Sequence, residues 1–199
     1  MRITWMAIAL AALVGSASAQ GFGVVDMAKV VNESSVAKKR LGELQELERK
    51  YNSVLQQMEQ NILMTPDERK TYYETAMLPA PNDAQKKAMS DIMNSAKTRG
   101  DALTVLQNTA TPSPEQTVRL NELTALATQG REQLRVLAEQ LNQQLQGELQ
   151  KGQDEVMTQV KAAIAAIAKE RKLSVVFNST GVVYADNDIT DLVIQRVSK

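Results

Sequence analysis

After Pro114 the chain runs without another proline, and an apolar stripe continues as far as about Arg171. As an α-helix this segment would extend roughly 80 Å, at about 1.5 Å per residue. A compact domain of about 180 residues has a radius of gyration of only about 16 Å. The helix therefore cannot lie inside a globular core, and the sequence predicts an elongated helical arm.

The apolar stripe keeps a helical period throughout. Its members are three or four residues apart up to Leu141, and after that the steps are four, four and three. Such an eleven-residue repeat has a period of about 3.67 residues per turn, which keeps a helix pair nearly straight or slightly right-handed. The stripe consists of Leu123, Ala127, Gly130, Leu134, Leu137, Leu141, Leu145, Leu149, Gly152, Val156, Val160, Ala163 and Ile167.

A second amphipathic segment, which Asn32 or Ser34 can cap, supplies a partner for the arm. Its apolar side chains recur every three or four residues, with polar and charged residues around the rest of the helix. A stripe this narrow needs another helix to bury it, so we expect the two segments to pair antiparallel. The stripe consists of Leu41, Leu44, Leu47, Tyr51, Val54, Leu55, Met58 and Ile62.

All five prolines lie between residues 66 and 114, where the helical pattern is interrupted. Residues 65–68 have the order of a helix start, with threonine at the N-cap, proline at N1 and glutamate at N3. Residues 78–82 end that short helix, because proline disfavours helix in the residue before it. Another helix is expected over 83–109, and a second capping box at 113–116 starts the long one. This region builds either an extra helical layer at the far end of the arm or kinks along it.

The two ends of the chain are typical of a small α/β body. Residues 21–27 form a short strand closed by Asp26, while 173–178 and 181–185 form two strands joined by a turn. Residues 189–197 then form a last helix, capped by Asn187 or Asp188.

The first strand must join the last two through space, so the helical hairpin is an insertion into this body. The predicted fold class is α+β, mostly α, with a long antiparallel coiled-coil hairpin. The body combines residues 20–34 and 172–199, and the arm spans 35–171 with a proline-rich distal region over 65–114.

The N-terminus has the layout of a secretory signal peptide over residues 1–19. Arg2 supplies the positive charge, and residues 3–14 form an apolar stretch too short to span a membrane comfortably. Residues 17–19 (ASA) have the small side chains that a signal peptidase needs, so we expect cleavage near Ala19 and export across the inner membrane. An uncleaved anchor helix is the alternative. The mature chain is expected to carry no integral membrane segment.

Composition excludes several kinds of chemistry. Cysteine and histidine are absent, which removes disulfides, thiolate nucleophiles, the usual zinc sites and histidine-based triads. The 23 basic residues equal the 23 acidic ones, so nothing in the charge indicates nucleic acid as a partner. Asp186, Asp188 and Asp191 lack the spacing of a calcium loop. A site of carboxylates alone, or of serine and lysine, stays formally open, but we expect no enzyme, no catalytic residue, no metal and no cofactor.

Two groups of residues, at opposite ends of this exported coiled coil, carry a resemblance to a known family. The first group is residues 23–27 (GVVDM), Val30 and 32–34 (NES), and the second is residues 162–171, 175–177 (VVF), 181–186 (GVVYAD) and 188–191 (DITD). Together they resemble the Skp/OmpH family of periplasmic chaperones. The best-known members of that family are strongly basic, whereas this chain is neutral, so contacts with acidic lipid or lipopolysaccharide do not carry over.

The resemblance implies a jellyfish-like homotrimer, in which the strands of three subunits associate and three helical hairpins surround a cavity. It also implies an ATP-independent periplasmic holdase that binds unfolded outer-membrane proteins within that cavity. The alternative is a structural role, in which an envelope scaffold binds one defined partner through its coiled coil.

Candidate binding residues follow from these expectations. Methionine is flexible and polarisable and suits a surface that must accept many sequences, although ordinary core between crossing helices would have the same composition. The candidate client-binding residues are Met58, Ile62, Met64, Tyr72, Tyr73, Met77, Leu78, Met89, Ile92 and Met93. The candidate body and trimer-interface residues are Val24, Val25, Val175, Phe177, Val182 and Tyr184.

Overall fold

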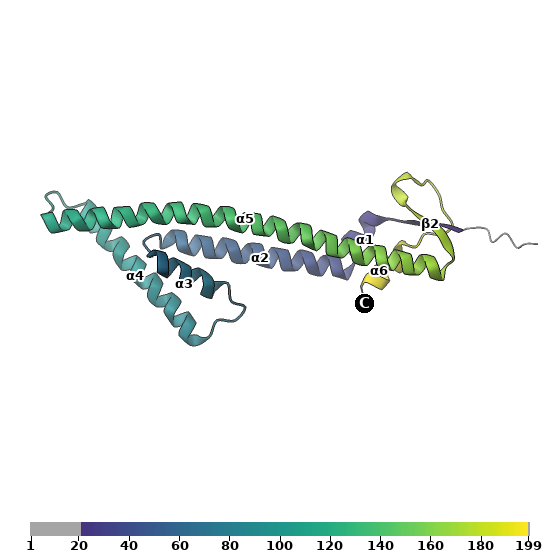
Figure 1. The fold of residues 1–199 in the computed structure, drawn as a ribbon, viewed down its shortest axis with the longest axis horizontal. Helices are drawn as coiled ribbons and strands as arrows, with labels where there is room; N and C mark the ends of the chain where they lie inside the picture. Colours follow the sequence, from purple (N-terminus) through teal and green to yellow (C-terminus); the bar gives the residue numbers. More distant parts are fainter. Residues whose placement is uncertain (1–20, 199) are drawn as a thin grey trace, which may run out of the picture. The chain divides into compact units, whose positions relative to one another are not determined.

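The computed structural model describes residues 21–198 of the chain, so the predicted signal peptide and its cleavage point lie outside the described residues. Helices account for 77% of the structure, which confirms the mostly α prediction. The elements are β1 Gly21–Val25, α1 Met27–Glu33, α2 Ser35–Gln60, α3 Pro66–Ala76, α4 Asp83–Gln107, α5 Pro114–Glu170, β2 Leu173–Asn178, the 3₁₀ turn η1 Ser179–Gly181 and α6 Thr190–Val197 (Figure 1).

The chain divides into two compact units. The first, which we call the body, contains the described residues up to Ser35 together with residues from Thr158 onward. The second, which we call the arm unit, is Val36–Met157. Helix α5 therefore contributes its C-terminal part to the body and the rest to the arm unit.

A two-stranded parallel sheet lies at the centre of the body. β1 pairs with β2 in a register that places Phe22 opposite Val175 and Val24 opposite Phe177. On its other edge, β1 exchanges backbone hydrogen bonds with the segment before α6, from Val24 N to Asn187 O and from Ile189 N to Val24 O, both at 2.9 Å. Apolar side chains of the sheet and of the helices of the body are buried. They include Val24, Val25, Val30, Val160, Ile167, Ile189 and Val193.

The strand predicted over residues 181–185 is wrong. Residues Ser179–Gly181 form a 3₁₀ turn, and the following segment leaves the sheet with Val183 and Tyr184 105% and 80% exposed. Its alternating apolar residues match a strand, but a strand needs a neighbour to satisfy its backbone groups. In the described chain, residues 187–189 take the free edge of β1 instead.

A short helix that was not predicted, α1, precedes the predicted one, and α2 begins at Ser35, directly after Ser34, one of its two predicted caps. Asp26 does not merely close β1: its side chain accepts a hydrogen bond from Lys29 N at 2.8 Å and so caps α1. Ser34 is extended, and this break separates α1 from α2. At the other end, α6 begins at Thr190, where the Asp188 carboxylate accepts from the Thr190 backbone N–H at 2.9 Å.

In the arm unit, α2 and α5 pair antiparallel. The pairing runs from Arg40, which contacts Glu148, through Tyr51, whose hydroxyl lies 3.3 Å from Gln144 Oε1, to Ile62, which lies against Gly130. Only part of the two predicted stripes is buried in the arm unit. The buried members there are Tyr51, Val54 and Met58 on α2 and Leu123, Ala127, Gly130, Leu141, Gly152 and Val156 on α5, whereas Leu41 is 56% exposed.

The proline-rich region forms an extra helical layer rather than kinks along the arm. α3 and α4 each begin with a capping box, at Thr65 with Glu68 and at Asn82 with Gln85. Val54 and Met58 of α2, Met64 and Tyr72 at α3, and Ala96 of α4 bury one another in a single cluster, against which Leu134 and Leu137 of α5 also pack. Helices α3 and α4 thus cover part of the α2–α5 pair.

Candidate functional site

The methionine-rich cluster is partly core and partly surface. Met58, Met64 and Tyr72 are at most 4% exposed, so their side chains hold the layer against the arm helices. Leu78 is 37% exposed at the end of α3. The remaining candidate client-binding residues are half-buried: Ile62, Tyr73, Met77, Met89, Ile92 and Met93. Ordinary core packing therefore accounts for three of the ten candidates, and the other seven present some apolar surface.

A buried arginine lies beside this cluster. Arg69 is 5% exposed, and its guanidinium donates from Nε to Gln133 Oε1 and from Nη1 to Ile62 O, each at 2.9 Å. Burial lowers the pKa of Arg69, while nearby Glu68 partly offsets that effect. Its Nη2 has no hydrogen-bond partner among the described residues. Arg69 thus connects α3 to α5 and to the loop after α2.

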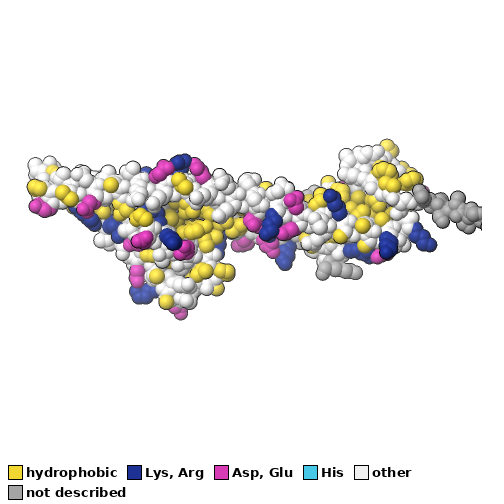
Figure 2. Space-filling model, in the orientation of Figure 1, with side chains coloured by type: hydrophobic (Ala, Val, Ile, Leu, Met, Phe, Trp, Pro, Cys, Tyr) yellow, Lys and Arg dark blue, Asp and Glu magenta, His cyan; other side chains and the backbone are white. Residues whose placement is uncertain are grey.

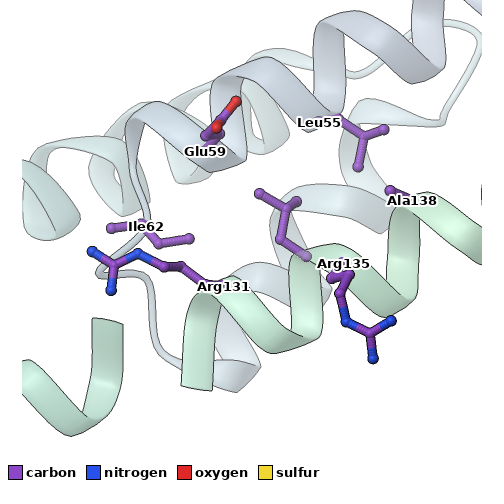
Figure 3. A pocket seen from close by; sticks show the side chains of 7 residues that line it. Leu55, Glu59, Ile62, Arg131, Arg135 and Ala138 are labelled. Atoms are coloured by element: carbon purple, nitrogen blue, oxygen red, sulfur yellow. The ribbon is translucent and has the colours of Figure 1, made fainter. Parts of the chain in front are cut away.

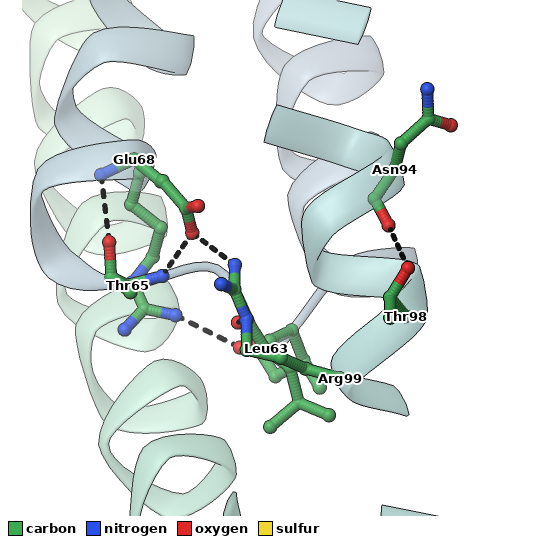
Figure 4. A network of polar contacts seen from close by, with 8 residues as sticks. Leu63, Thr65, Glu68, Asn94, Thr98 and Arg99 are labelled. Carbon is green, nitrogen blue, oxygen red and sulfur yellow. Dashed lines mark hydrogen bonds and ion pairs between the residues drawn. The ribbon is translucent and has the colours of Figure 1, made fainter. Parts of the chain in front are cut away.

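A second polar contact fixes α4 to the start of α3 (Figure 4). The Glu68 carboxylate accepts from Thr65 N at 2.7 Å and forms an ion pair with Arg99. Arg99 also donates from Nε to Leu63 O at 2.7 Å. The capping box at Thr65 was predictable from the local sequence. The pair with Arg99 was not, because 31 residues separate the two side chains along the chain.

An open groove of about 520 Å³ follows the seam between α2 and α5 (Figure 3). Its residues are Leu55, Glu59 and Ile62 from α2 and the loop after it, and Arg131, Leu134, Arg135 and Ala138 from α5. The four apolar side chains are half-buried and form the floor, while the three charged ones are exposed at the rim. Figure 2 shows apolar side chains gathered along this boundary between α5 and the helices beside it. We call this feature the seam groove.

The body exposes apolar side chains as well. Phe22, Val175 and Phe177 are 59%, 41% and 49% exposed, and the rings of the two phenylalanines lie 6.2 Å apart. Their register places them on one face of the sheet. Val183 and Tyr184, in the segment after η1, are exposed as well. We use the name body patch for these five exposed side chains of the body. Exposed apolar patches often mark interaction sites.

The six candidate body residues are divided between the interior and this patch. Val24 and Val25 are buried inside the body, and Val182 is half-buried. Val175, Phe177 and Tyr184 belong to the body patch. Phe22 and Val183 are exposed members of the patch that were not among the candidate interface residues. Phe22 directly precedes residues 23–27, which carry part of the family resemblance.

Within residues 21–198, no group of three or more acidic side chains is placed to hold a metal ion. Over the same residues, no helix combines the length and apolarity that crossing a bilayer requires.

A small parallel-stranded body interrupted by long antiparallel helices defines a class of helical-arm proteins. A model of the family described as "Outer membrane protein (OmpH-like)" matches residues 21–197, and the chain belongs to this OmpH-like family. The predicted resemblance is therefore confirmed. Members of this family are periplasmic chaperones of outer-membrane proteins, and these chaperones are not enzymes. No curated protein matched the chain.

Proposed function

We propose that this chain is an ATP-independent periplasmic holdase that keeps unfolded outer-membrane proteins from aggregating, in a cavity between the helical arms of a homotrimer. The membership of residues 21–197 in the OmpH-like family is the observation that carries this proposal. Apolar surface left exposed in both the arm unit and the body supports it, because a holdase and its assembly both need such surface. A signal peptide over residues 1–19 would deliver the chain to the periplasm.

The body patch supports the homotrimer. A sheet of two short strands is marginal by itself, and the outer edge of β2 has no strand partner within the described chain. An unpaired edge with apolar side chains above it is a template for another chain. We therefore assign Val175, Phe177 and Tyr184 to the subunit interface, with Val24 and Val25 supporting them from the interior.

Client contacts in this proposal come from members of the methionine-rich cluster that are exposed or half-buried. Met77, Leu78, Met89 and Met93 are flexible or exposed apolar side chains that can adapt to many sequences. Each contact is individually weak, and several arms acting together supply the affinity. No nucleotide is then needed for release, because each contact dissociates easily.

A binding titration tests the proposal. The only tryptophan of the sequence is Trp5, inside the predicted signal peptide, so a chain starting at Gln20 leaves the emission of client tryptophans free of background. We expect the emission of a urea-diluted barrel protein to change saturably at about one trimer per client without nucleotide. Unrelated unfolded proteins should bind as well. Binding restricted to one folded partner would instead indicate the scaffold alternative.

A further inference from the structure

The seam groove has the dimensions of a short peptide site. Its α5 residues run from Arg131 to Ala138, which corresponds to about 10 Å along a helix. In an extended chain, side chains two residues apart lie on the same face and about 6.7 Å from one another. The floor can therefore receive two apolar side chains from one face of an extended segment.

The charges at the rim are not equivalent. Arg135 is neutralised by Glu132 and Glu139, whose carboxylate oxygens lie 2.7 and 2.5 Å from its guanidinium nitrogens. Arg131 is exposed and forms no hydrogen bond or ion pair with any residue that the structure describes. Figure 3 shows its side chain extending toward Ile62, at one end of the groove, whereas the Glu59 carboxylate points away from α5.

The free cation indicates which segments fit. An acidic side chain that follows two alternating apolar ones would reach Arg131 while the apolar side chains occupy the floor. We propose that the seam groove binds short extended client segments of this pattern, apolar at alternate positions and acidic at the end that meets Arg131. This inference rests on the proposed function, since it concerns where and how the same clients are held.

Two synthetic peptides with the same alternating apolar core test the charge requirement. One ends in glutamate and the other in lysine, and fluorescence anisotropy measures their affinity for the whole mature chain. We expect the glutamate peptide to bind about two- to fivefold more tightly. Arg131→Glu should reverse that preference. Arg119→Glu, on the same helix but outside the groove, should leave it unchanged.

Filling the floor tests the apolar requirement. Ala138→Phe should weaken both peptides by about tenfold, because one apolar side chain loses its place in the groove. Val136→Phe is the matched control, because Val136 is exposed on α5 and does not line the groove. Should Ala138→Phe disturb the fold, the reversal by Arg131→Glu still decides the matter, since misfolding cannot exchange one preference for the other.

Aggregation of an unfolded barrel protein, followed with the same variants, separates the two claims. The seam groove is supported if the unmodified chain suppresses aggregation and the Ala138→Phe and Arg131→Glu variants suppress it less. Equal suppression by all variants, with no difference between the peptides, overturns the groove and leaves the proposed function standing. No suppression by the unmodified chain overturns the proposed function, and this inference with it.

Discussion

Thr190 connects three parts of the body through its hydroxyl group. The Asp26 backbone N–H donates to Thr190 Oγ1 at 2.8 Å, and the Thr190 hydroxyl lies 2.5 Å from Asp188 Oδ1. Thr190 is 4% exposed, so water cannot replace these bonds. Replacing it by valine keeps the shape but leaves the Asp26 N–H unpaired. Thr190→Val should lower the free energy of unfolding by about 1–3 kcal/mol, measured by urea denaturation.

Thr180→Val is the control for that change. Thr180 is exposed in η1, and its hydroxyl contacts only the neighbouring Asn178 side chain among the hydrogen bonds described. The free energy of unfolding of this control should stay within about 0.5 kcal/mol of the unmodified chain. Equal losses from the two substitutions would show that the Thr190 bonds are not what joins β1 to α6.

The same site gives the body a dependence on pH. Hydrogen bonds from the Thr190 hydroxyl and backbone N–H hold the pKa of Asp188 below its ordinary value of 3.8. A lowered pKa in the folded state means that the ionised carboxylate stabilises the fold above the ordinary pKa. That stabilisation is lost as the pH falls through the lowered pKa.

Asp188→Asn isolates this effect, because the amide keeps an acceptor oxygen but does not titrate. The free energy of unfolding should be lower for the variant at pH 7. The difference between the two proteins should shrink as the pH falls below about 4. A difference that stays constant over this range would show that the Asp188 charge contributes nothing.

Among the helices, two glycines of α5 lie in opposite surroundings: Gly130 is in close contact with neighbouring segments, and Gly147 faces open space. A Cβ at Gly130 would lie 2.5 Å from Ile62 O and 2.6 Å from Arg69 Nη1, whereas a Cβ at Gly147 would meet nothing within 4 Å. Gly147→Ala should stabilise the arm unit by about 0.5–1 kcal/mol through helix propensity. Gly130→Ala should destabilise it by about 1–3 kcal/mol, because a backbone carbonyl cannot move aside easily. Thermal and urea unfolding of both variants provide the measurement, and stabilisation by both would contradict the observed packing of α2 against α5.

Elements defined by local chemistry were the most predictable from sequence. The capping boxes at Thr65 and at Ser113 depend on residues three apart, and both form as expected. The segment 181–185 failed because strand formation depends on a partner elsewhere, and the alternating pattern carries no information about which edge is free. The Arg99–Glu68 pair and the burial of Arg69 depend likewise on how the layer folds back, which the sequence pattern left open.

At the scale of the whole molecule, assembly should depend on the body patch. Phe177→Glu places a charge among exposed apolar side chains beside the free edge of β2. In the proposed homotrimer, burying that charge would be costly. The mass in solution, measured by light scattering, should fall from three chains to one.

Val105→Glu is the matched control for assembly. Val105 is 67% exposed on α4, in the arm unit, so this variant should stay trimeric. A trimer that survives Phe177→Glu would show that the subunits do not associate through this patch.

The candidate binding surface was only partly predictable. The sequence identified the methionine-rich region, but the packing of the layer decides which side chains remain exposed, and it buries Met58, Met64 and Tyr72. The seam groove was not predicted. Leu55 and Leu134 occur in the two apolar stripes, and nothing in a stripe says which of its members remains uncovered when the helices pair.

The most direct test of the holdase function is light scattering of an unfolded outer-membrane barrel protein diluted from urea, with and without the mature chain. A holdase should suppress the scattering without nucleotide, with the full effect at about one trimer per client. Aggregation that proceeds unchanged in the presence of the folded protein would contradict the holdase function and favour a scaffold that binds one defined partner.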